Sequence, residues 1–422
     1  MFRCVLISLG FLVLAVEPYR AYGSTRAYVS THDLFAEHLN DSQVSGVTQG
    51  NFCNDVISKF GYKCQEYKVK TADKYILGVS RILPSTKQAP GAGCTRTPVI
   101  LQHGLMTDGN CWFLNNRNQN LPCILADRGF DVWIANTRGT RFSTGHETMS
   151  TKDKEYWDWS WDELAKYDLP AYVKFVNTQT KQKPHYIGHS QGTIIALAAF
   201  SEGKVTNMLR SASLLSPVAY LSHMLSAFDR VAAKSFLADA GMLIGLAEFD
   251  IKQFHVMNYL NLICSTNRLN CYDPITIGTG KNCCLNSSTI VEFLKNNPQP
   301  TAMKNLVHLS QTVRDDRFAK YDYGRHNHGQ GNMEKYGQLT PPSYVLSKIP
   351  KSFPMFITHG GKDALSDPQD VELLKKELQS HDSDKMTVQY VPNYAHMDFI
   401  MGTNANRVVY EPLISFIKHH GN

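Results

Sequence analysis

Residues 185–200 read HYIGHSQGTIIALAAF, a short apolar strand that runs into a glycine-rich turn and then into a helix. The turn carries the pattern Gly-x-Ser-x-Gly at Gly188, Ser190 and Gly192. Between a strand and a helix this pattern is typical of a nucleophile elbow, a strained turn that lifts the serine hydroxyl out of the sheet. Glycine is needed on both sides because a side chain there would collide with neighbouring backbone. We therefore favour a nucleophilic Ser190 over an ordinary glycine-rich turn.

Apolar, β-branched segments alternate with helical stretches along most of the chain. This alternation predicts the α/β class, with a mostly parallel central sheet flanked by helices. Strands that are covered on both faces explain apolar runs without strict alternation. We expect strands at 65–69, 75–81, 98–102, 131–135, 185–187, 211–215, 355–358 and 386–390. We expect helices near 122–128, 168–177, 193–201, 370–378 and 407–419.

One long segment, residues 220–347, breaks the alternation of strands and helices. It is rich in Ala, Leu, Met and Phe over 224–249, and four cysteines with many Asn, Gly and Tyr follow. We expect either a helical cap inserted above the site or a second small domain with its own core. In both cases residues 24–219 and 348–422 form the two parts of the main domain.

The first residues are typical of a processing signal. Arg3 precedes an apolar run over 4–16, and Ala21-Tyr22-Gly23 suits cleavage, so we expect a signal peptide at 1–23. The run is too short to span a bilayer, and no other stretch of about 18 apolar residues follows. We therefore expect a chain without a transmembrane segment that enters the secretory pathway, for an extracellular or vacuolar/lysosomal location. The net charge of +6 comes without a basic run, which argues against nucleic acid as a partner.

The cysteines agree with an oxidising compartment. Ten are present, and without Cys4 nine remain, so several should pair and at least one thiol should stay free. Cys283 and Cys284 are adjacent and no Cys-x-x-Cys pair exists, so we expect no metal site and no cofactor. In a secreted chain, the sequons that begin at Asn40 and Asn286 predict glycosylation.

A serine nucleophile needs a base within hydrogen-bond reach, and that base needs a carboxylate to orient it. In α/β-hydrolases the acid follows a late strand and the histidine follows the last strand. Asp363 comes after the expected strand 355–358 in a glycine-rich turn, and His396 comes after the last expected strand. Asp367 precedes a proline and suits a helix N-cap instead. Asp398 could orient a histidine, but it lies after the base in the chain.

Two backbone N–H groups should bind the negative charge that develops on the substrate oxygen. One comes from the residue after the nucleophile, Gln191, and the other from the loop after the third strand, where Leu105 follows His103-Gly104. We expect His103 and His189 to support these loops by hydrogen bonds and to transfer no proton.

With these residues in place, the chain resembles the acid lipases of the α/β-hydrolase superfamily, the gastric and lysosomal lipase group, and most closely its plant triacylglycerol lipase-like branch. The likeness runs in family order from about residue 50 to 400. The matching segments are GYKCQEY at 61–67, LQHGL at 101–105, DVWIANTRG at 131–139, YDLP at 167–170, GHSQG at 188–192, LSPVA at 215–219, GGKD at 360–363 and YAH at 394–396.

The resemblance implies an α/β-hydrolase fold with an inserted helical cap at 220–347, whose first part acts as a lid. It implies a Ser190–Asp363–His396 triad, with Leu105 and Gln191 as oxyanion donors. It also implies a disulfide between Cys264 and Cys271. The chain departs from the family at Asp73-Lys74-Tyr75, where a turn glycine is replaced by lysine, and in the polar residues 107–110 beside the expected acyl pocket.

These features predict a serine ester hydrolase that cleaves lipid esters of the triacylglycerol type at a lipid–water interface. An esterase or acyltransferase that acts on a small specialised-metabolite ester is the alternative, and a catalytically silent lipid-binding protein is a third reading. In the first case we expect apolar lid residues to cover the site in water, among them Met224, Leu225, Phe228, Phe236, Met242 and Leu243.

Overall fold

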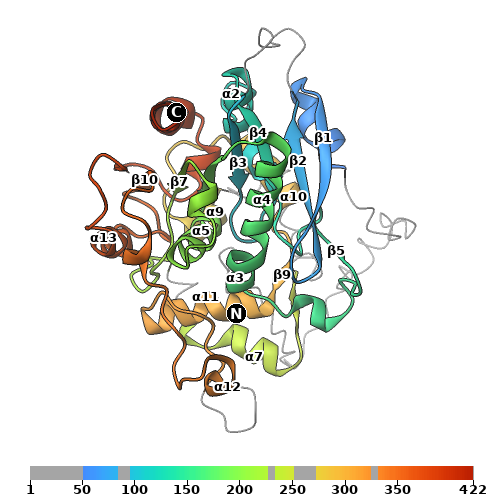
Figure 1. Ribbon diagram of the computed structural model, residues 1–422, viewed down its shortest axis with the longest axis vertical. Helices are drawn as coiled ribbons and strands as arrows, with labels where there is room; N and C mark the ends of the chain where they lie inside the picture. The colour runs from blue at the N-terminus through green and yellow to red at the C-terminus, as the bar shows by residue number, and fades with distance from the viewer. Residues whose placement is uncertain (1–50, 84–95, 227–232, 251–271, 325–330, 422) are drawn as a thin grey trace, which may run out of the picture.

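The structure, a computed structural model, describes residues 51–83, 96–226, 233–250, 272–324 and 331–421. Within these residues a nine-stranded sheet forms the centre of the molecule (Figure 1). Its strands are β1 Cys64–Lys70, β2 Tyr75–Ile82, β3 Pro98–Gln102, β4 Asp131–Ala135, β5 Gly145–His146, β6 His185–His189, β7 Ser211–Leu215, β10 Met355–Gly360 and β11 Met386–Val391.

The strand order is β1-β2-β4-β3-β6-β7-β10-β11, and β5 pairs with β2. Every neighbouring pair from β4 to β11 is parallel, whereas β1, β2 and β4 pair antiparallel. The predicted mostly parallel sheet is therefore confirmed. All eight expected strands occur, three of them with the expected bounds and the others longer by one or two residues. The two-residue strand β5 was not expected, because so short an element leaves no periodic signal.

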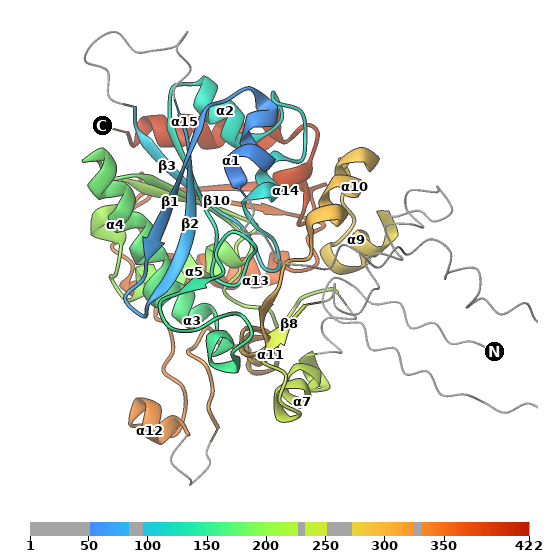
Figure 2. The ribbon, with the colours of Figure 1, turned by 90° about the vertical axis from the view of Figure 1, so that its right-hand side faces the viewer.

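Helices cover both faces of the sheet, as Figure 2 shows from the side. The described helices are α1 Phe52–Asp55, α2 Leu121–Asp127, α3 Trp161–Glu163, α4 Leu169–Thr180, α5 Gln191–Ser201, α7 Leu237–Leu243, α9 Tyr272–Thr279, α10 Ser287–Asn296, α11 Met303–Asp315, α12 Asn332–Tyr336, α13 Pro368–Glu377, α14 Asp398–Met401 and α15 Glu411–His419.

The alternation of side chains along each strand divides the core into two layers. On β3, Val99 and Leu101 pack with the apolar residues of α2 and α15. Ile100 points to the opposite face and packs with α4 and α5. Since both faces are covered, the strand is buried throughout, which explains its continuous apolar run.

The described part of segment 220–347 adds no strand to the large sheet. It contains α7, α9, α10, α11 and α12, and a separate two-stranded sheet of β8 Glu248–Phe249 and β9 Thr301–Ala302. Helices α7 and α11 pack against each other at one end of the molecule (Figures 1 and 2). Helices α7, α11 and α12 therefore lie at one end of the sheet domain, whereas α9 and α10 lie beside it (Figures 1 and 2).

Local signals read from the sequence explain several boundaries. Asp367 caps α13, because its side chain accepts a hydrogen bond from the Gln369 amide at 2.8 Å, which confirms the N-cap interpretation. Asn286 caps α10 in the same way, through the Ser288 amide, and it is exposed at the surface. Lys74 takes a left-handed backbone conformation, with φ at 75°, so the turn accommodates the lysine in a geometry that glycine favours.

Among the described residues, two disulfides and two free thiols account for six cysteines. Cys53 pairs with Cys64, and Cys283 pairs with its neighbour Cys284. The thiols of Cys111 and Cys123 are buried and free. The sequence predicted neither of these pairings.

Several predictions fall on parts of the chain that the structure does not describe. They concern the signal peptide at 1–23, the sequon at Asn40, Phe228, and the disulfide between Cys264 and Cys271. None of the described helices has both the length and the apolar character needed to cross a membrane.

Candidate active site

The turn between β6 and α5 has the backbone that the sequence predicts for an elbow. Ser190 has φ 55° and ψ −120°, a conformation that L-residues rarely adopt. A Cβ atom on Gly192 would lie 2.8 Å from the carbonyl oxygen of Gln102, and one on Gly188 would lie 2.9 Å from the carbonyl oxygen of Gly192. Both positions therefore require glycine, and the strained serine projects beyond the carboxyl end of the strand.

The loop after β3 lies against this serine. A Cβ atom on Gly104 would be 2.9 Å from the Cβ atom of Ser190. Within the described part of the chain, the amides of Leu105 and Gln191 donate to no other group. The Gln191 amide is free because it belongs to the first residue of α5, which has no acceptor inside the helix. Two unused N–H donors thus adjoin the serine.

His103 supports the first of these loops. Its Nε2 atom accepts a hydrogen bond from the Thr137 amide at 3.1 Å, and its Nδ1 atom donates to the carbonyl of Gly104 at 2.9 Å. Burial lowers the pKa of His103, which keeps the ring neutral. His103 therefore holds the loop in place, as predicted.

His189, just before the serine, contacts the loop of the predicted base. Its Nε2 atom lies 3.0 Å from the carbonyl oxygen of His396, and the two imidazole rings are 4.8 Å apart. Burial and the neighbouring imidazole hold the pKa of His189 well below its usual range, so the neutral ring donates through Nε2. The elbow and the His396 loop are thus directly joined.

Asp363 and His396 lie together although they are far apart in the sequence. The Nδ1 atom of His396 is 3.1 Å and 3.0 Å from the two carboxylate oxygens of Asp363. Both side chains are buried, and the amides of Leu365 and Ser366 donate to the same carboxylate at 2.9 Å and 2.8 Å. This contact fixes the ring and leaves Nε2 for another partner. No hydrogen bond joins the described side chains of His396 and Ser190, and catalytic contacts of this kind often tighten only with substrate bound.

Ser190 opens into a cavity of about 140 Å³ whose lining is predominantly apolar. One wall comes from the sheet domain and the other from segment 220–347. The apolar lining side chains are Leu105, Met106, Ile194, Val218, Leu221, Met224, Ala233, Leu306, Leu309, Val313 and Leu365.

The polar residues 107–110 do not line this cavity, so the expectation that they border the acyl pocket was wrong. Asp108 is fully buried and forms an ion pair with Arg141, with 2.6 Å between Oδ2 and Nε. It also caps the following helical turn through the Asn110 amide. A short polar side chain that caps a helix and pairs with a cation explains the polarity without any substrate.

The expected lid residues fall into two groups. Met224 is buried and lines the cavity. Leu225, Phe236, Met242 and Leu243 are exposed, with 88% of Leu243 accessible, so these four do not cover the site as expected. Of these, Phe236, Met242 and Leu243 leave apolar surface open to solvent on and beside α7.

Asp398 lies closer to the candidate base, through the main chain, than its place after His396 in the sequence indicated. Its carboxylate is buried and accepts three main-chain hydrogen bonds, and burial raises its pKa to about 6. In the described part of the chain, one cluster is compact enough for a metal ion, namely Cys283, Cys284 and Asp398 within 4.8 Å. Both sulfurs are used in a disulfide, so this cluster offers no thiolate ligands.

Comparisons with known proteins agree with this geometry. A family described as "alpha/beta hydrolase fold" matches residues 97–403, and one described as "Partial alpha/beta-hydrolase lipase region" matches residues 53–116. The chain is 49% identical to Triacylglycerol lipase 2 of Arabidopsis thaliana over 370 residues, which covers 87% of this chain and 88% of the relative. It is 35% identical to human gastric triacylglycerol lipase over 402 residues, which covers 92% and 95% of the two chains.

Solved structures agree on the fold. A soluble variant of monoglyceride lipase from Saccharomyces cerevisiae superposes with a TM-score of 0.54 at 14% identity, covering 86% of this chain and 98% of that chain. At this identity the likeness concerns the fold alone. The matches in sequence extend over nearly the whole chain, and they decide the family. The chain belongs to the lipases of the α/β-hydrolase family, a group of carboxylic ester hydrolases.

Proposed function

We propose that this enzyme hydrolyses lipid esters through an acyl-serine intermediate on Ser190. The arrangement that carries the proposal is a strained serine that opens into an apolar cavity, beside a histidine held by a buried carboxylate. His396 takes the serine proton through Nε2 while Oγ attacks the ester carbonyl carbon. Asp363 keeps the Nδ1 proton in place and stabilises the imidazolium that forms.

The amides of Leu105 and Gln191 bind the negative oxygen of the tetrahedral intermediate. Such donors contribute about 3 kcal/mol each to lowering the barrier. His396 then gives its proton to the departing alcohol oxygen and the acyl-serine forms. Water attacks the acyl carbon with His396 again as the base, and the fatty acid leaves.

The character of the cavity supports the proposal that the enzyme binds a long acyl chain. The lining side chains are almost all aliphatic, so they favour a hydrocarbon chain over a polar metabolite. Both relatives above carry the name triacylglycerol lipase, which supports a triacylglycerol as the substrate. We propose segment 220–347 as the cap that supplies one wall of this cavity.

The exposed apolar side chains on and beside α7 support contact with a lipid surface. Leu243 and Ile244 are 88% and 79% exposed, and such patches on soluble proteins mark interaction sites. We further propose a secretory route, because the two disulfides in the described residues need an oxidising compartment. The signal peptide at 1–23 and the glycosylation sites remain predictions.

The decisive experiment is a hydrolysis panel of short-chain and long-chain esters from pH 4 to 9, with the wild type and Ser190→Ala side by side. We expect Ser190→Ala to lose hydrolysis and labelling by a fluorophosphonate. Ser201→Ala, at the far end of α5, is the matched control and should keep both. Equal activity of Ser190→Ala and the wild type would refute the mechanism, and a rate that saturates in solution with short esters alone would refute the lipid substrate.

A further inference from the structure

A short segment of the insertion holds together the two loops that carry the candidate acid and base. The carbonyl of Thr279 accepts hydrogen bonds from the His396 amide at 3.1 Å and from the Ala364 amide at 3.4 Å. The next residue, Gly280, forms a β-bridge with Asp363. A Cβ atom on Gly280 would lie only 2.0 Å from the carbonyl oxygen of Lys362, so only glycine permits this approach. The insertion therefore contacts both loops through the main chain.

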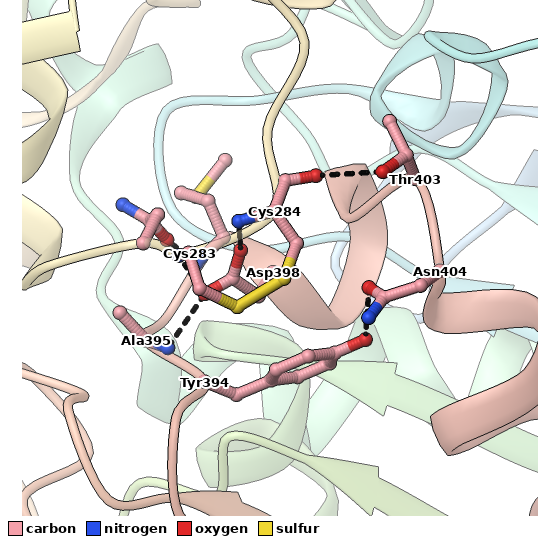
Figure 3. The surroundings of a disulfide bond; sticks show 9 residues. Cys283, Cys284, Tyr394, Ala395, Asp398, Thr403 and Asn404 are labelled. Atoms are coloured by element: carbon pink, nitrogen blue, oxygen red, sulfur yellow. Dashed lines mark hydrogen bonds between the residues drawn. A yellow bond between two sulfur atoms is a disulfide. The ribbon is translucent and has the colours of Figure 1, made fainter.

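Asp398 extends this contact on the side of the base. Its buried carboxylate accepts a hydrogen bond from the Ala395 amide at 2.8 Å, immediately before His396. It also accepts hydrogen bonds from the amides of Cys283 and Cys284, both at 3.1 Å (Figure 3). One carboxylate thus ties the base loop to the adjacent cysteine pair.

The disulfide joins the two residues whose consecutive amides donate to the Asp398 carboxylate. Linking adjacent cysteines closes a small ring around their peptide bond, which restricts both residues. The carbonyl of Cys284 accepts a further hydrogen bond from the Thr403 amide at 2.8 Å, beyond α14. While the disulfide is intact, the amides of Cys283 and Cys284 stay aligned with the Asp398 carboxylate.

The disulfide is also accessible to a reductant. Cys283 is exposed, and both cysteines line a surface hollow of about 470 Å³. Lys281 and Lys362 line the same hollow and are exposed. Their positive charges favour the approach of a thiolate.

We propose that Asp398 is a positioning residue for His396, and that the Cys283–Cys284 disulfide is a redox-sensitive brace for it. The proposal rests on the proposed function, in which His396 is the base. A dithiol attacks one sulfur of the disulfide and forms a mixed disulfide with the protein. Its second thiol then attacks this mixed disulfide, which releases the protein thiol and turns the reagent into a cyclic disulfide. Two electrons and two protons pass to the protein, so Cys283 and Cys284 become thiols. The amide donors are then released from the ring and the base loop loses its fixed position.

Reduction of the Cys283–Cys284 disulfide should lower the turnover rate and leave folding unchanged. A displacement of about 1 Å at a reacting group can cost about 100-fold in rate. A disulfide stabilises a fold according to the length of the loop that it closes, and adjacent cysteines close the shortest loop possible. Reduction should therefore lower kcat while KM and the unfolding temperature stay nearly unchanged.

The first test compares kcat and KM on a soluble ester with and without dithiothreitol, at pH 7, where the Asp398 carboxylate is ionised. We expect dithiothreitol to lower kcat of the wild type by about tenfold to 100-fold, with KM within about twofold. The double variant Cys283→Ser/Cys284→Ser should start at the lower kcat and ignore dithiothreitol. The matched control Cys53→Ser/Cys64→Ser keeps the brace and should remain sensitive.

The second test removes the carboxylate. Asp398→Asn offers one acceptor oxygen where three amides converge, so we expect a loss of kcat similar to that of the cysteine variant. Combining it with Cys283→Ser/Cys284→Ser should add little further loss, because all three changes act through one set of hydrogen bonds. Fluorophosphonate labelling of Ser190 should slow in parallel, and circular dichroism should match the wild type.

The outcomes separate the two proposals. Full kcat in both Asp398→Asn and the cysteine variant would overturn the brace while leaving the proposed function intact. Sensitivity to dithiothreitol that persists in Cys283→Ser/Cys284→Ser would also overturn it, because another disulfide would be responsible. Undiminished activity of Ser190→Ala would instead overturn the proposed function.

Discussion

The carboxyl group of Asp162 should make the stability of this enzyme depend on pH. It lies at the start of α3, where it accepts hydrogen bonds from the Tyr344 hydroxyl at 2.6 Å and from the Tyr321 amide at 2.9 Å. Burial raises its pKa to about 6 from an ordinary value of 3.8. The Nδ1 atom of His308 is 4.0 Å away, and burial lowers the pKa of His308 to about 3, so that ring stays neutral above pH 4.

The direction and the size of the pH effect on stability follow from the raised pKa of Asp162. Because the folded state holds the Asp162 proton more tightly than the unfolded state, the free energy of unfolding falls as pH rises from about 4 to about 6 and levels off above that. A shift of about two pKa units corresponds to about 3 kcal/mol. The side chain of Asp162→Asn cannot ionise, so the variant should not show this pH-dependent fall in the free energy of unfolding. Its free energy of unfolding, relative to the wild type, should rise by about 2 kcal/mol between pH 4 and pH 7.

The assay is urea unfolding of both proteins at pH 4, 5.5 and 7. The amide nitrogen of the variant faces one of the two donors, which adds a constant penalty, so the reasoning depends on the slope with pH and not on the offset. Asp55→Asn, on the exposed surface of α1, is the control and should follow the wild type. A stability difference that stays constant across this range would show that the folded state does not hold the Asp162 proton more tightly than the unfolded state.

Three further changes test other contacts. In Gly104→Ala, a Cβ atom 2.9 Å from that of Ser190 should displace the nucleophile and lower kcat by about 100-fold, with the thermal midpoint retained. Arg138→Met leaves the buried Asp168 without its cation and should cost about 3–5 kcal/mol in denaturant unfolding, and an unchanged midpoint would contradict the role of this pair. Lys74→Gly relieves a left-handed lysine and should raise the free energy of unfolding by about 1 kcal/mol, whereas a loss would show that the turn is not strained.

The sequence was most informative where chemistry depends on strand ends. Buried strands produce long apolar runs, so their positions were predicted within one or two residues. Because parallel strands present their carboxyl ends at one edge, the same reading placed Asp363 and His396 together, and the structure has them in contact. The cap of α13 by Asp367 was predicted for a similarly local reason.

Contacts made through the main chain escaped prediction. Two of the three amides that donate to Asp398 belong to Cys283 and Cys284, more than a hundred positions away in the sequence. Nearly every residue type carries a main-chain amide, so the sequence does not indicate such a contact. The exposure of Leu243 was also missed, since an apolar helix reads the same whether it faces a core or solvent. Two-residue strands such as β8 and β9 are too short for any periodicity.

The two walls of the cavity come from different stretches of the chain. Leu306, Leu309 and Val313 of α11 form one wall, whereas Ile194 follows the nucleophile on α5. Substitutions on the first wall reshape the space for the acyl chain without changing any group that moves a proton. Under the proposed function, α11 can therefore vary one wall of the cavity independently of the catalytic groups, and we expect an exchange of α11 between paralogues to shift chain-length preference.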